Sequence, residues 1–323
     1  MTEVPPQISP TVDAIWAARL AEAAARPQYE GYGISASELG QECDRRMFYT
    51  LRWTSPPEQM TGRKLRIFER GDIEEERVIA DLRRAGLDVL DRDPDTGRQF
   101  SFTLANGWLR GKADGRAWGF IEAPKAEHVI EIKSLKAADW RAIEKHGLRA
   151  KKPEHWHQLH TGMLGLGVNR GAYIGVNKDT EEILIERVHL DQEEGNRQEA
   201  RVLRAVAAHE APQRISEKPD FFTCRFCPHH AHCHTGTDAR RHCRSCLHFS
   251  FGDGGNGHCD RFDKPLKPAE QRAGATCPAH LYLPSLVHGE QIDADPEAET
   301  VTYRKPDGSI WIDGQQENTP CNS

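Results

Sequence analysis

The sequence of 323 residues predicts an α/β protein in which a central mixed sheet is flanked by helices and followed by a cysteine-rich C-terminal extension. Two observations predict this fold class. Between residues 33 and 211, segments with apolar residues at helical spacing alternate with short segments rich in β-branched residues. After Pro212 this periodicity fades, and Cys, His, Gly and Pro become frequent. We therefore expect one large domain with smaller segments at both ends.

The N-terminal part of the chain is predicted to be helical. Residues 1–32 form the expected helical lead-in, because VDAIWAARLAEAAA has apolar residues at helical spacing. In ISASELGQECDRRMFYTLRW, Ser35 is the expected N-cap of a helix that carries Cys43. RGDIEEERVIADLRRAG predicts another helix that ends near Gly86, with Glu75 on the side of its apolar stripe. That stripe consists of Val78, Ile79 and Leu82.

The middle of the chain is predicted to supply the sheet. RQFSFTLANGWLRGKADGRAW and HVIEIKSLK indicate strands joined by turns, and a basic helical segment follows over residues 141–152. PEHWHQLHTGMLGLG then predicts a helix, RGAYIGVNKDTEEILIERV a hairpin, and EEGNRQEARVLRAVAAHEA a long helix. Near the C-terminus, TVTYRKPDGSIWI predicts a small hairpin within an acidic tail, residues 290–323, that we otherwise expect to be loose.

HVIEIKSLK contains an acid and a base two residues apart, Glu131 and Lys133, which therefore share one face of the strand. Alone, such a pair is typical of a salt bridge on a solvated face. Here a hairpin with Asp114 on the preceding strand would bring two carboxylates to one point. Together with the backbone carbonyl of Ile132 they form an all-oxygen site suited to Mg²⁺ or Mn²⁺, to which Glu75 adds a third carboxylate.

These groups are suited to phosphodiester hydrolysis. A divalent cation polarises the phosphoryl oxygen and lowers the pKa of the attacking water. Lys133 is expected to position or help deprotonate that water and to offset the phosphate charge.

The overall charge does not indicate nucleic acid, since the net charge is -6 and the pI about 6.2. A DNA site must therefore be a local basic patch. The basic run after the EIK strand is either a solvated face or a set of phosphate contacts. It consists of Arg141, Lys145, Arg149, Lys151 and Lys152. We expect a cytoplasmic protein without a membrane partner, because no apolar stretch of about 18 residues and no secretory signal is present.

The cysteines form two sets by spacing, and in a cytoplasmic protein such sets suggest metal rather than disulfides. The first is C-x2-C-x5-C and needs a fourth ligand for a tetrahedral zinc or a 4Fe–4S cluster. It consists of Cys224, Cys227 and Cys233, and the nearby candidates for the fourth ligand are His229, His230, His232 and His234. The second set indicates a zinc-ribbon-like site in which structural Zn²⁺ folds a segment too polar to hold a core. It consists of Cys243, Cys246, Cys259 and Cys277.

In order along the chain, these segments resemble the PD-(D/E)XK nuclease superfamily, and within it the RecB-like and phage recombination exonucleases. The resemblance covers roughly residues 33–235 and implies a restriction-endonuclease-like core. RGDIEEERVIADLRRAG resembles the first motif, with Glu75 as the aligned acid and Glu74 and Glu76 as alternatives. GKADG matches with Asp114, EIK with Glu131 and Lys133, HWHQLHTGMLGLG with Gln158 on a helix that contacts the active site, and YIGVNKDTEEI with Lys178 near the substrate.

This chain departs from the family pattern in three places. Ala113 precedes Asp114 where the family name has Pro, and Glu75 stands where many RecB-like members carry a His. Gln158 is not followed by the Tyr often found a few residues later.

The resemblance also implies a fourth ligand for the first cysteine set. Iron–sulfur members of the family have one Cys well before the catalytic core and three just after it, and Cys43 has that position. A 4Fe–4S cluster would then staple the N-terminal region to the end of the nuclease domain, with Zn²⁺ as the alternative. The expected organisation is a lead-in (1–32), a nuclease domain (33–236), a four-cysteine zinc segment (237–289) and the tail (290–323).

The expected function is a metal-dependent DNA exonuclease that acts from DNA ends in phage or prophage recombination or in repair. Its partner besides DNA would be a single-strand annealing protein or a helicase. One alternative is a CRISPR-adaptation-type nuclease or an endonuclease with the same core. Another is a non-catalytic DNA-binding or assembly module that acts through its zinc ribbon. A metal-sensing regulator would leave the acidic cluster unexplained.

Overall fold

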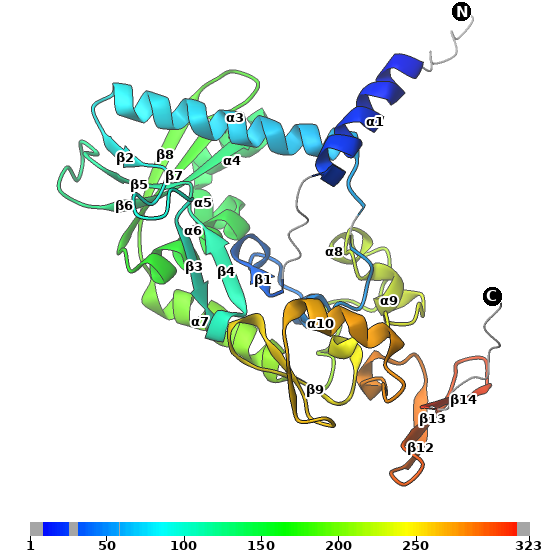
Figure 1. The fold of residues 1–323 in the computed structure, drawn as a ribbon. Coiled ribbons are helices and arrows are strands. Elements are labelled where there is room, and N and C mark those ends of the chain that lie inside the picture. The colour runs from blue at the N-terminus through cyan, green and yellow to red at the C-terminus, as the bar shows by residue number, and fades with distance from the viewer. Residues whose placement is uncertain (1–8, 26–31, 58, 315–323) are drawn as a thin grey trace, which may run out of the picture.

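The structure is a computed structural model that describes residues 9–25, 32–57 and 59–314. Its centre is a five-stranded mixed sheet in the order β2-β5-β6-β7-β8 (Figure 1). β6 and β7 run parallel, and the other neighbours pair antiparallel. These strands are β2 (Asp88–Leu90), β5 (Gly115–Trp118), β6 (His128–Leu135), β7 (Arg170–Asn177) and β8 (Ile183–His189). The predicted mixed α/β class with a central sheet is confirmed.

Helices cover both faces of this sheet. The helix α3 (Gly62–Arg84) packs its predicted stripe on one face, against Ile130 and Ile132 of β6. The other face is covered by α4 (Ala137–His146), α5 (Leu148–Lys151) and α6 (Pro153–Leu166). Since β6 alternates, Val129 and Leu135 face this second layer, and Glu131 and Lys133 point to the same side.

Before the central sheet, the chain forms the predicted lead-in helix. The next predicted helix, which was expected to carry Cys43, is interrupted. The lead-in helix α1 (Pro10–Ala25) lies against the start of α3 (Figure 1), where Trp16 packs on Gly62. Ser35 caps only a 3-10 turn, and its N–H donates to Glu38 at 3.1 Å. Cys43 is the N-cap of α2 (Asp44–Leu51), so the prediction of one helix carrying Cys43 is wrong.

The break has a steric cause at Gly40. A Cβ there would lie 2.1 Å from the Cα of Glu154, because the chain passes tightly over the start of α6. Around it lies a second sheet in the order β1-β4-β3, which packs with α2 and α7. These elements are β1 (Ile34–Ser35), β3 (Ser101–Leu104), β4 (Leu109–Lys112) and α7 (Gln192–Ala207).

The C-terminal part consists of short elements packed beside α2. The first are α8 (Phe222–Arg225), α9 (His230–His234) and α10 (Pro268–Ala273) with the antiparallel strands β9 (Phe249–Phe251), β10 (Gly257–Cys259) and β11 (Lys264–Leu266). The predicted hairpin around Gly308 is confirmed, and its strands are β13 (Thr300–Arg304) and β14 (Ile310–Asp313).

The expectation of an otherwise loose tail is wrong for β12 (Glu290–Asp295), which pairs with the free edge of β13. Tyr303 and Val301 of β13 are buried against Leu281 and hold this sheet on the body. Residues 315–323, with Cys321, lie outside the described residues, as do residues 1–8 and 26–31 of the lead-in. No helix in the described part of the chain is long and apolar enough to cross a membrane.

Candidate active site

The bend between β4 and β5, the strand β6 and the helix α3 bring the predicted acidic residues together. Asp114 lies in the bend between β4 and β5, and Glu131 and Lys133 lie on β6. The pairing of Gly115 with Ile130 sets Asp114 beside the EIK sequence. The Asp114 Oδ2 accepts a hydrogen bond of 2.7 Å from the backbone N–H of Ile132. The two carboxylates are thus held at one point by the backbone, as the hairpin argument predicted.

Glu131 and Lys133 form a buried ion pair rather than one on a solvated face. Glu131 is only 2% exposed, whereas the Lys133 side chain keeps 27% of its surface accessible. The Lys133 ammonium donates to the Glu131 carboxylate and, at 3.2 Å, to the backbone carbonyl of Ile132. That carbonyl is the one predicted to bind a cation, so Lys133 contacts two of the predicted ligands.

Glu75 is the acid of α3 that belongs to this cluster. Of the two alternatives, Glu74 is buried and pairs with Arg77 at 3.1 Å, and Glu76 is exposed. Burial, and then the charge of Asp114, raises the pKa of Glu75 to about 7. The structure therefore places Glu75, Asp114, Glu131 and Lys133 within one electrostatic site.

Burial raises the pKa of all three carboxyl groups, so a proton or a cation has to offset their charge. Burial raises the pKa of Glu131 to about 8, with Asp114 and Glu75 acting in the same direction and Lys133 against it. Burial also raises the pKa of Asp114. Burial by itself would lower the pKa of Lys133, but the three carboxylates outweigh it and raise that pKa. One lysine does not balance three carboxylates, and an all-oxygen set of this kind suits a hard divalent cation.

Two residues of this site were not anticipated, Tyr173 and His155. Tyr173 on β7 stands directly opposite Glu131 in the parallel register and is fully buried. Its hydroxyl and the Nδ1 of His155 on α6 are 2.9 Å apart, and the two rings are stacked. Burial, and then Lys133 and Lys152, lowers the pKa of His155 to about 3, so this ring is neutral. Only the β6–β7 register, which no local pattern reveals, could have identified Tyr173.

The remaining predicted site residues lie on elements that adjoin β6. Gln158 is half-buried on α6, one turn after His155. Lys178 follows β7 directly, and its backbone N–H donates to the carbonyl of Leu135 at the end of β6 (3.0 Å). Lys178 therefore lies at the end of the strand that carries Lys133.

The basic run divides into exposed and internally engaged residues. Arg141, Lys145 and Lys151 are exposed on α4 and α5. Lys152, in contrast, pairs with Asp139 at 3.3 Å. The guanidinium of Arg149 lies over the ring of Trp156, 4.4 Å from its centroid. Arg149 is itself exposed, so Arg141, Lys145 and Lys151 differ from it in having no ion pair or ring contact of this kind in the described part of the chain.

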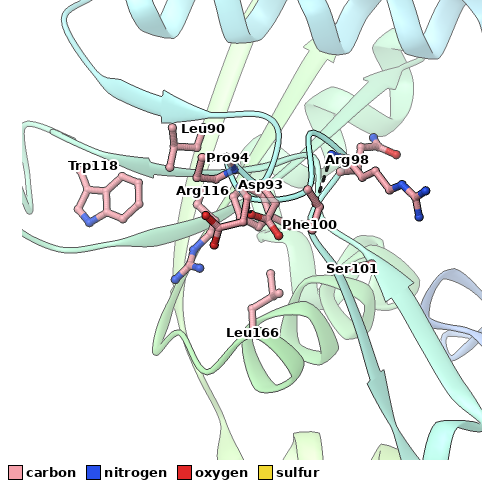
Figure 2. A pocket seen from close by; sticks show the side chains of 12 residues that line it. Leu90, Asp93, Pro94, Arg98, Phe100, Ser101, Arg116, Trp118 and Leu166 are labelled. Carbon is pink, nitrogen blue, oxygen red and sulfur yellow. Dashed lines mark hydrogen bonds between the residues drawn. The ribbon is translucent and has the colours of Figure 1, made fainter. Parts of the chain in front are cut away.

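A cavity of about 740 Å³ lies on the side of β5 to which Asp114 belongs, although no residue of the carboxylate–lysine cluster lines it. Because alternate residues share a face, Asp114 is followed on that side by Arg116 and Trp118, which both line the cavity. Figure 2 shows Trp118 and Arg116 on β5, with Leu166 of α6 on the opposite wall and the loop 93–100 between them. The cavity thus offers an indole ring and an apolar wall, while its lining also contains Asp93 and Asp95, and the Arg116 guanidinium is paired with Glu127.

The first cysteine set converges as the resemblance implied. Cys43 at the start of α2 lines one small cavity with the cysteines of α8 and α9. Burial, and then the nearby thiols of Cys43 and Cys233, raises the pKa of Cys224. Three of the four neighbouring histidines use ring nitrogens in hydrogen bonds, His229 with Thr50 and Ser55, His230 with the Pro219 carbonyl, and His232 with the Thr237 carbonyl. His234 lines the cavity and has a buried Nε2 without a hydrogen-bond partner in the described part of the chain.

The second set converges separately. Cys243, Cys246, Cys259 and Cys277 line a second cavity, and no ligand is exchanged between the sets. Burial, and then the three other thiols, raises the pKa of Cys243 to about 11. All eight cysteines of the two sets are free. The grouping by spacing and resemblance therefore matches the grouping in space.

As the side chains are placed, no group of three or more His, Cys, Asp or Glu among the described residues stands close enough to hold a metal ion. At the acidic cluster, the hydrogen bond of Asp114 with the Ile132 N–H and the ion pair of Glu131 with Lys133 engage the carboxylate oxygens that a cation would use.

The molecule is thus a mixed α/β protein with a buried carboxylate–lysine cluster on its central sheet. No family model matches the sequence, and no curated protein does. Among solved structures, SSO0001 is similar at 16% identity and a TM-score of 0.38, covering 69% of this chain and 96% of that one. The alkaline exonuclease LHK-Exo from Laribacter hongkongensis is similar at 16% identity and a TM-score of 0.39, covering 60% of this chain and 91% of that one. Its complex with dAMP has 18% identity with the same TM-score and coverage.

Proposed function

We propose that this protein is a metal-dependent deoxyribonuclease that acts from DNA ends. The observation that carries the proposal is the convergence of Asp114, Glu131 and Lys133, with Glu75, at a largely buried point of the sheet. Burying carboxylates is costly unless their charge is used or paired. A module that only binds DNA has no need of this arrangement, whereas phosphodiester hydrolysis does.

Each residue has a role that its position supports. Glu75, Asp114, Glu131 and the Ile132 carbonyl would hold Mg²⁺ or Mn²⁺. When bound, such a cation polarises the phosphoryl oxygen and lowers the pKa of a water molecule. Lys133, whose raised pKa keeps it an ammonium group, orients that water or offsets the phosphate charge.

Two residues of α6, His155 and Gln158, are proposed to position the site and its substrate. The Tyr173 hydroxyl ties β7 to His155 on α6, and this fixes the helix layer over Glu131. Gln158, one turn later on the same helix, is proposed to contact the substrate beside the carboxylates. Both contacts act by positioning, which is the main source of catalysis in phosphoryl transfer.

The surroundings support a DNA strand as substrate. The cavity on the Asp114 side of β5 has an aromatic side chain, Trp118, that could stack on a base of a single strand, with Arg98 and Arg116 as basic residues beside Asp93 and Asp95. Lys178 and the exposed Arg141, Lys145 and Lys151 are proposed to contact phosphates. A recombination or repair role with an annealing protein or a helicase is part of this proposal.

The cysteine sets are proposed to be structural metal sites. Cys43 with Cys224, Cys227 and Cys233 would hold a 4Fe–4S cluster, and Zn²⁺ with His234 among the ligands is the alternative. Either would tie α2 to α8 and α9 and so close a loop of about 180 residues. The second set would hold structural Zn²⁺.

The experiment compares end-labelled linear DNA with covalently closed circular DNA, in Mg²⁺ or Mn²⁺, using protein purified without oxygen. Glu75→Ala tests the site, and Glu76→Ala, its exposed neighbour on the same helix, is the matched control. We expect wild type and the control to release nucleotides from linear DNA only. Cleavage of the circle would identify an endonuclease. No release by folded, metal-loaded wild type would refute the nuclease and favour a DNA-binding module.

A further inference from the structure

Two arginines are buried beside the second cysteine set without an acidic partner. Arg244 is 0% exposed and Arg52 1% exposed. Within residues 9–25, 32–57 and 59–314, neither pairs with an Asp or Glu. Their hydrogen bonds go to neutral oxygens, namely those of Gln271, Tyr32 and Leu51 for Arg244 and those of Arg244 and Ala208 for Arg52.

These hydrogen bonds leave one nitrogen atom of each guanidinium group without an acceptor. The Nε of Arg52 and the Nη2 of Arg244 are buried with no hydrogen-bond partner in the described part of the chain. Arg244 lies over the ring of Trp53 at 3.8 Å, and Arg52 lies over that of Phe251 at 4.7 Å. Aromatic faces attract a cation but carry no net charge. Since guanidinium groups stay protonated and buried charges are normally paired, two positive charges here require an anion nearby.

The second cysteine set is a candidate to supply it, because the charge of the Cys246 thiolate acts on Arg52. Arg244 lies within the C-x2-C knuckle, between Cys243 and Cys246. Arg52 approaches from the end of α2 and donates to the Arg244 carbonyl at 3.2 Å. It also lies over Phe249, which packs in one cluster with Cys246. Four protonated thiols are neutral, but four thiolates around a divalent ion carry a net charge of about -2.

We propose that Arg52 and Arg244 are the counter-charges of a four-thiolate, dianionic metal site formed by the second cysteine set. The proposal distinguishes a metal site with four cysteine ligands from one in which histidine replaces a cysteine. His248 and His280 line the same cavity, and each has a buried ring nitrogen without a partner in the described residues. Each histidine that replaced a thiolate would remove one negative charge from a site beside two buried arginines and a further positive charge, that of Arg110. The buried arginines therefore favour four cysteines.

The same contacts couple this metal site to the sheet domain. Arg52 belongs to the α2 end, and Arg244 reaches back to the carbonyls of Tyr32 and Leu51 at 2.7 and 2.9 Å. Loss of the metal would leave two unbalanced charges at this contact between the segments. The inference rests on the proposed second metal site and is independent of the proposed nuclease activity.

The test measures zinc release from the full-length protein to a chromogenic chelator. Arg52→Met keeps the volume and removes the charge, Arg52→Lys keeps the charge, and Arg261→Met is the matched control. Arg261 lines the same cavity but is already paired with Glu299. We expect Arg52→Met to weaken zinc retention by about 10- to 100-fold, with Arg52→Lys closer to wild type and Arg261→Met near wild type. Equal release by Arg52→Met and Arg261→Met would overturn the proposal.

A second measurement needs no arginine variant and so holds if Arg52→Met does not fold. Wild type and a variant in which all four cysteines of the second set are replaced by serine are loaded with Co²⁺, and their difference spectrum isolates the second site. The sulfur-to-cobalt absorption should correspond to four thiolates. An intensity corresponding to two or three thiolates would place histidine in the site and overturn the proposal.

Discussion

Replacing Glu131 with Gln should change how the stability of this protein depends on pH. Burial raises the pKa of Glu131 from 4.5 in its ordinary state to about 8 in the folded protein. A carboxyl whose pKa is raised by folding stabilises the protein below pH 4.5, and this stabilisation is lost as the pH rises through about 8. The glutamine side chain does not titrate, so the difference between the two proteins isolates Glu131.

The size of the effect follows from the pKa change. Between pH 5.5 and 7.5 the folded protein retains the Glu131 proton, whereas the unfolded chain has lost it. Wild type should therefore lose about 1.4 kcal/mol of unfolding free energy per pH unit relative to Glu131→Gln, or up to about 3 kcal/mol over this range. Buried histidines act in the opposite direction, since burial lowers the pKa of His155 and of His229 to about 3. Their contribution is the same in both proteins and cancels in the difference.

The assay is urea unfolding followed by tryptophan fluorescence at several pH values. Protein is dialysed free of Mg²⁺ without a chelator, so that metal bound by the cysteines stays in place. Adding Mg²⁺ should flatten the wild-type slope, because the cation competes with the proton for the same oxygens. A difference that stays constant from pH 5.5 to 7.5 would refute the reasoning. It would mean that the attraction of Lys133 outweighs burial and that Glu131 ionises normally.

Three further outcomes are expected. Lys133→Met should lower kcat on linear DNA by about 10²- to 10³-fold or more, because a charge aimed at the reacting phosphate is lost; an unchanged kcat would remove Lys133 from the reaction. Trp118→Ala should weaken binding of single-stranded DNA by roughly 5- to 150-fold, through the loss of one stacking contact of about 1–3 kcal/mol, and the exposed Phe262→Ala is the control in the same fluorescence-anisotropy titration. Tyr173→Phe should cost about 1 kcal/mol of unfolding free energy, because His155 loses a buried hydrogen bond of 2.9 Å, and unfolding curves that superimpose on wild type would contradict this.

Much of the local structure could be predicted. The strand period placed Glu131 and Lys133 on one side of β6, and the helical period identified the stripe by which α3 packs on the sheet. The predicted hairpin placed Asp114 beside these two residues, and in the structure the Ile132 N–H donates a hydrogen bond to the Asp114 carboxylate. Cysteine spacing likewise separated the second set, which lines its own cavity.

The failures occurred where distant packing decides local structure. The single helix expected to carry Cys43 is interrupted, because Gly40 lies tightly against the start of α6. The tail expected to be loose contains β12, because β13 offers it a free edge. Neither interruption nor pairing leaves a local pattern in the sequence that could indicate it.

The sequence by itself determined which residues can share a face and which cysteines belong to one loop, because helix and strand periods depend only on neighbouring residues. The tertiary structure alone decided that Tyr173 stands beside Glu131, since this depends on the register between two strands about 40 residues apart. It also decided the burial that raises the pKa of Glu131 and that leaves Arg52 and Arg244 without acidic partners. Burial depends on how the whole chain packs, and in a low-dielectric interior it sets the energy of every charge.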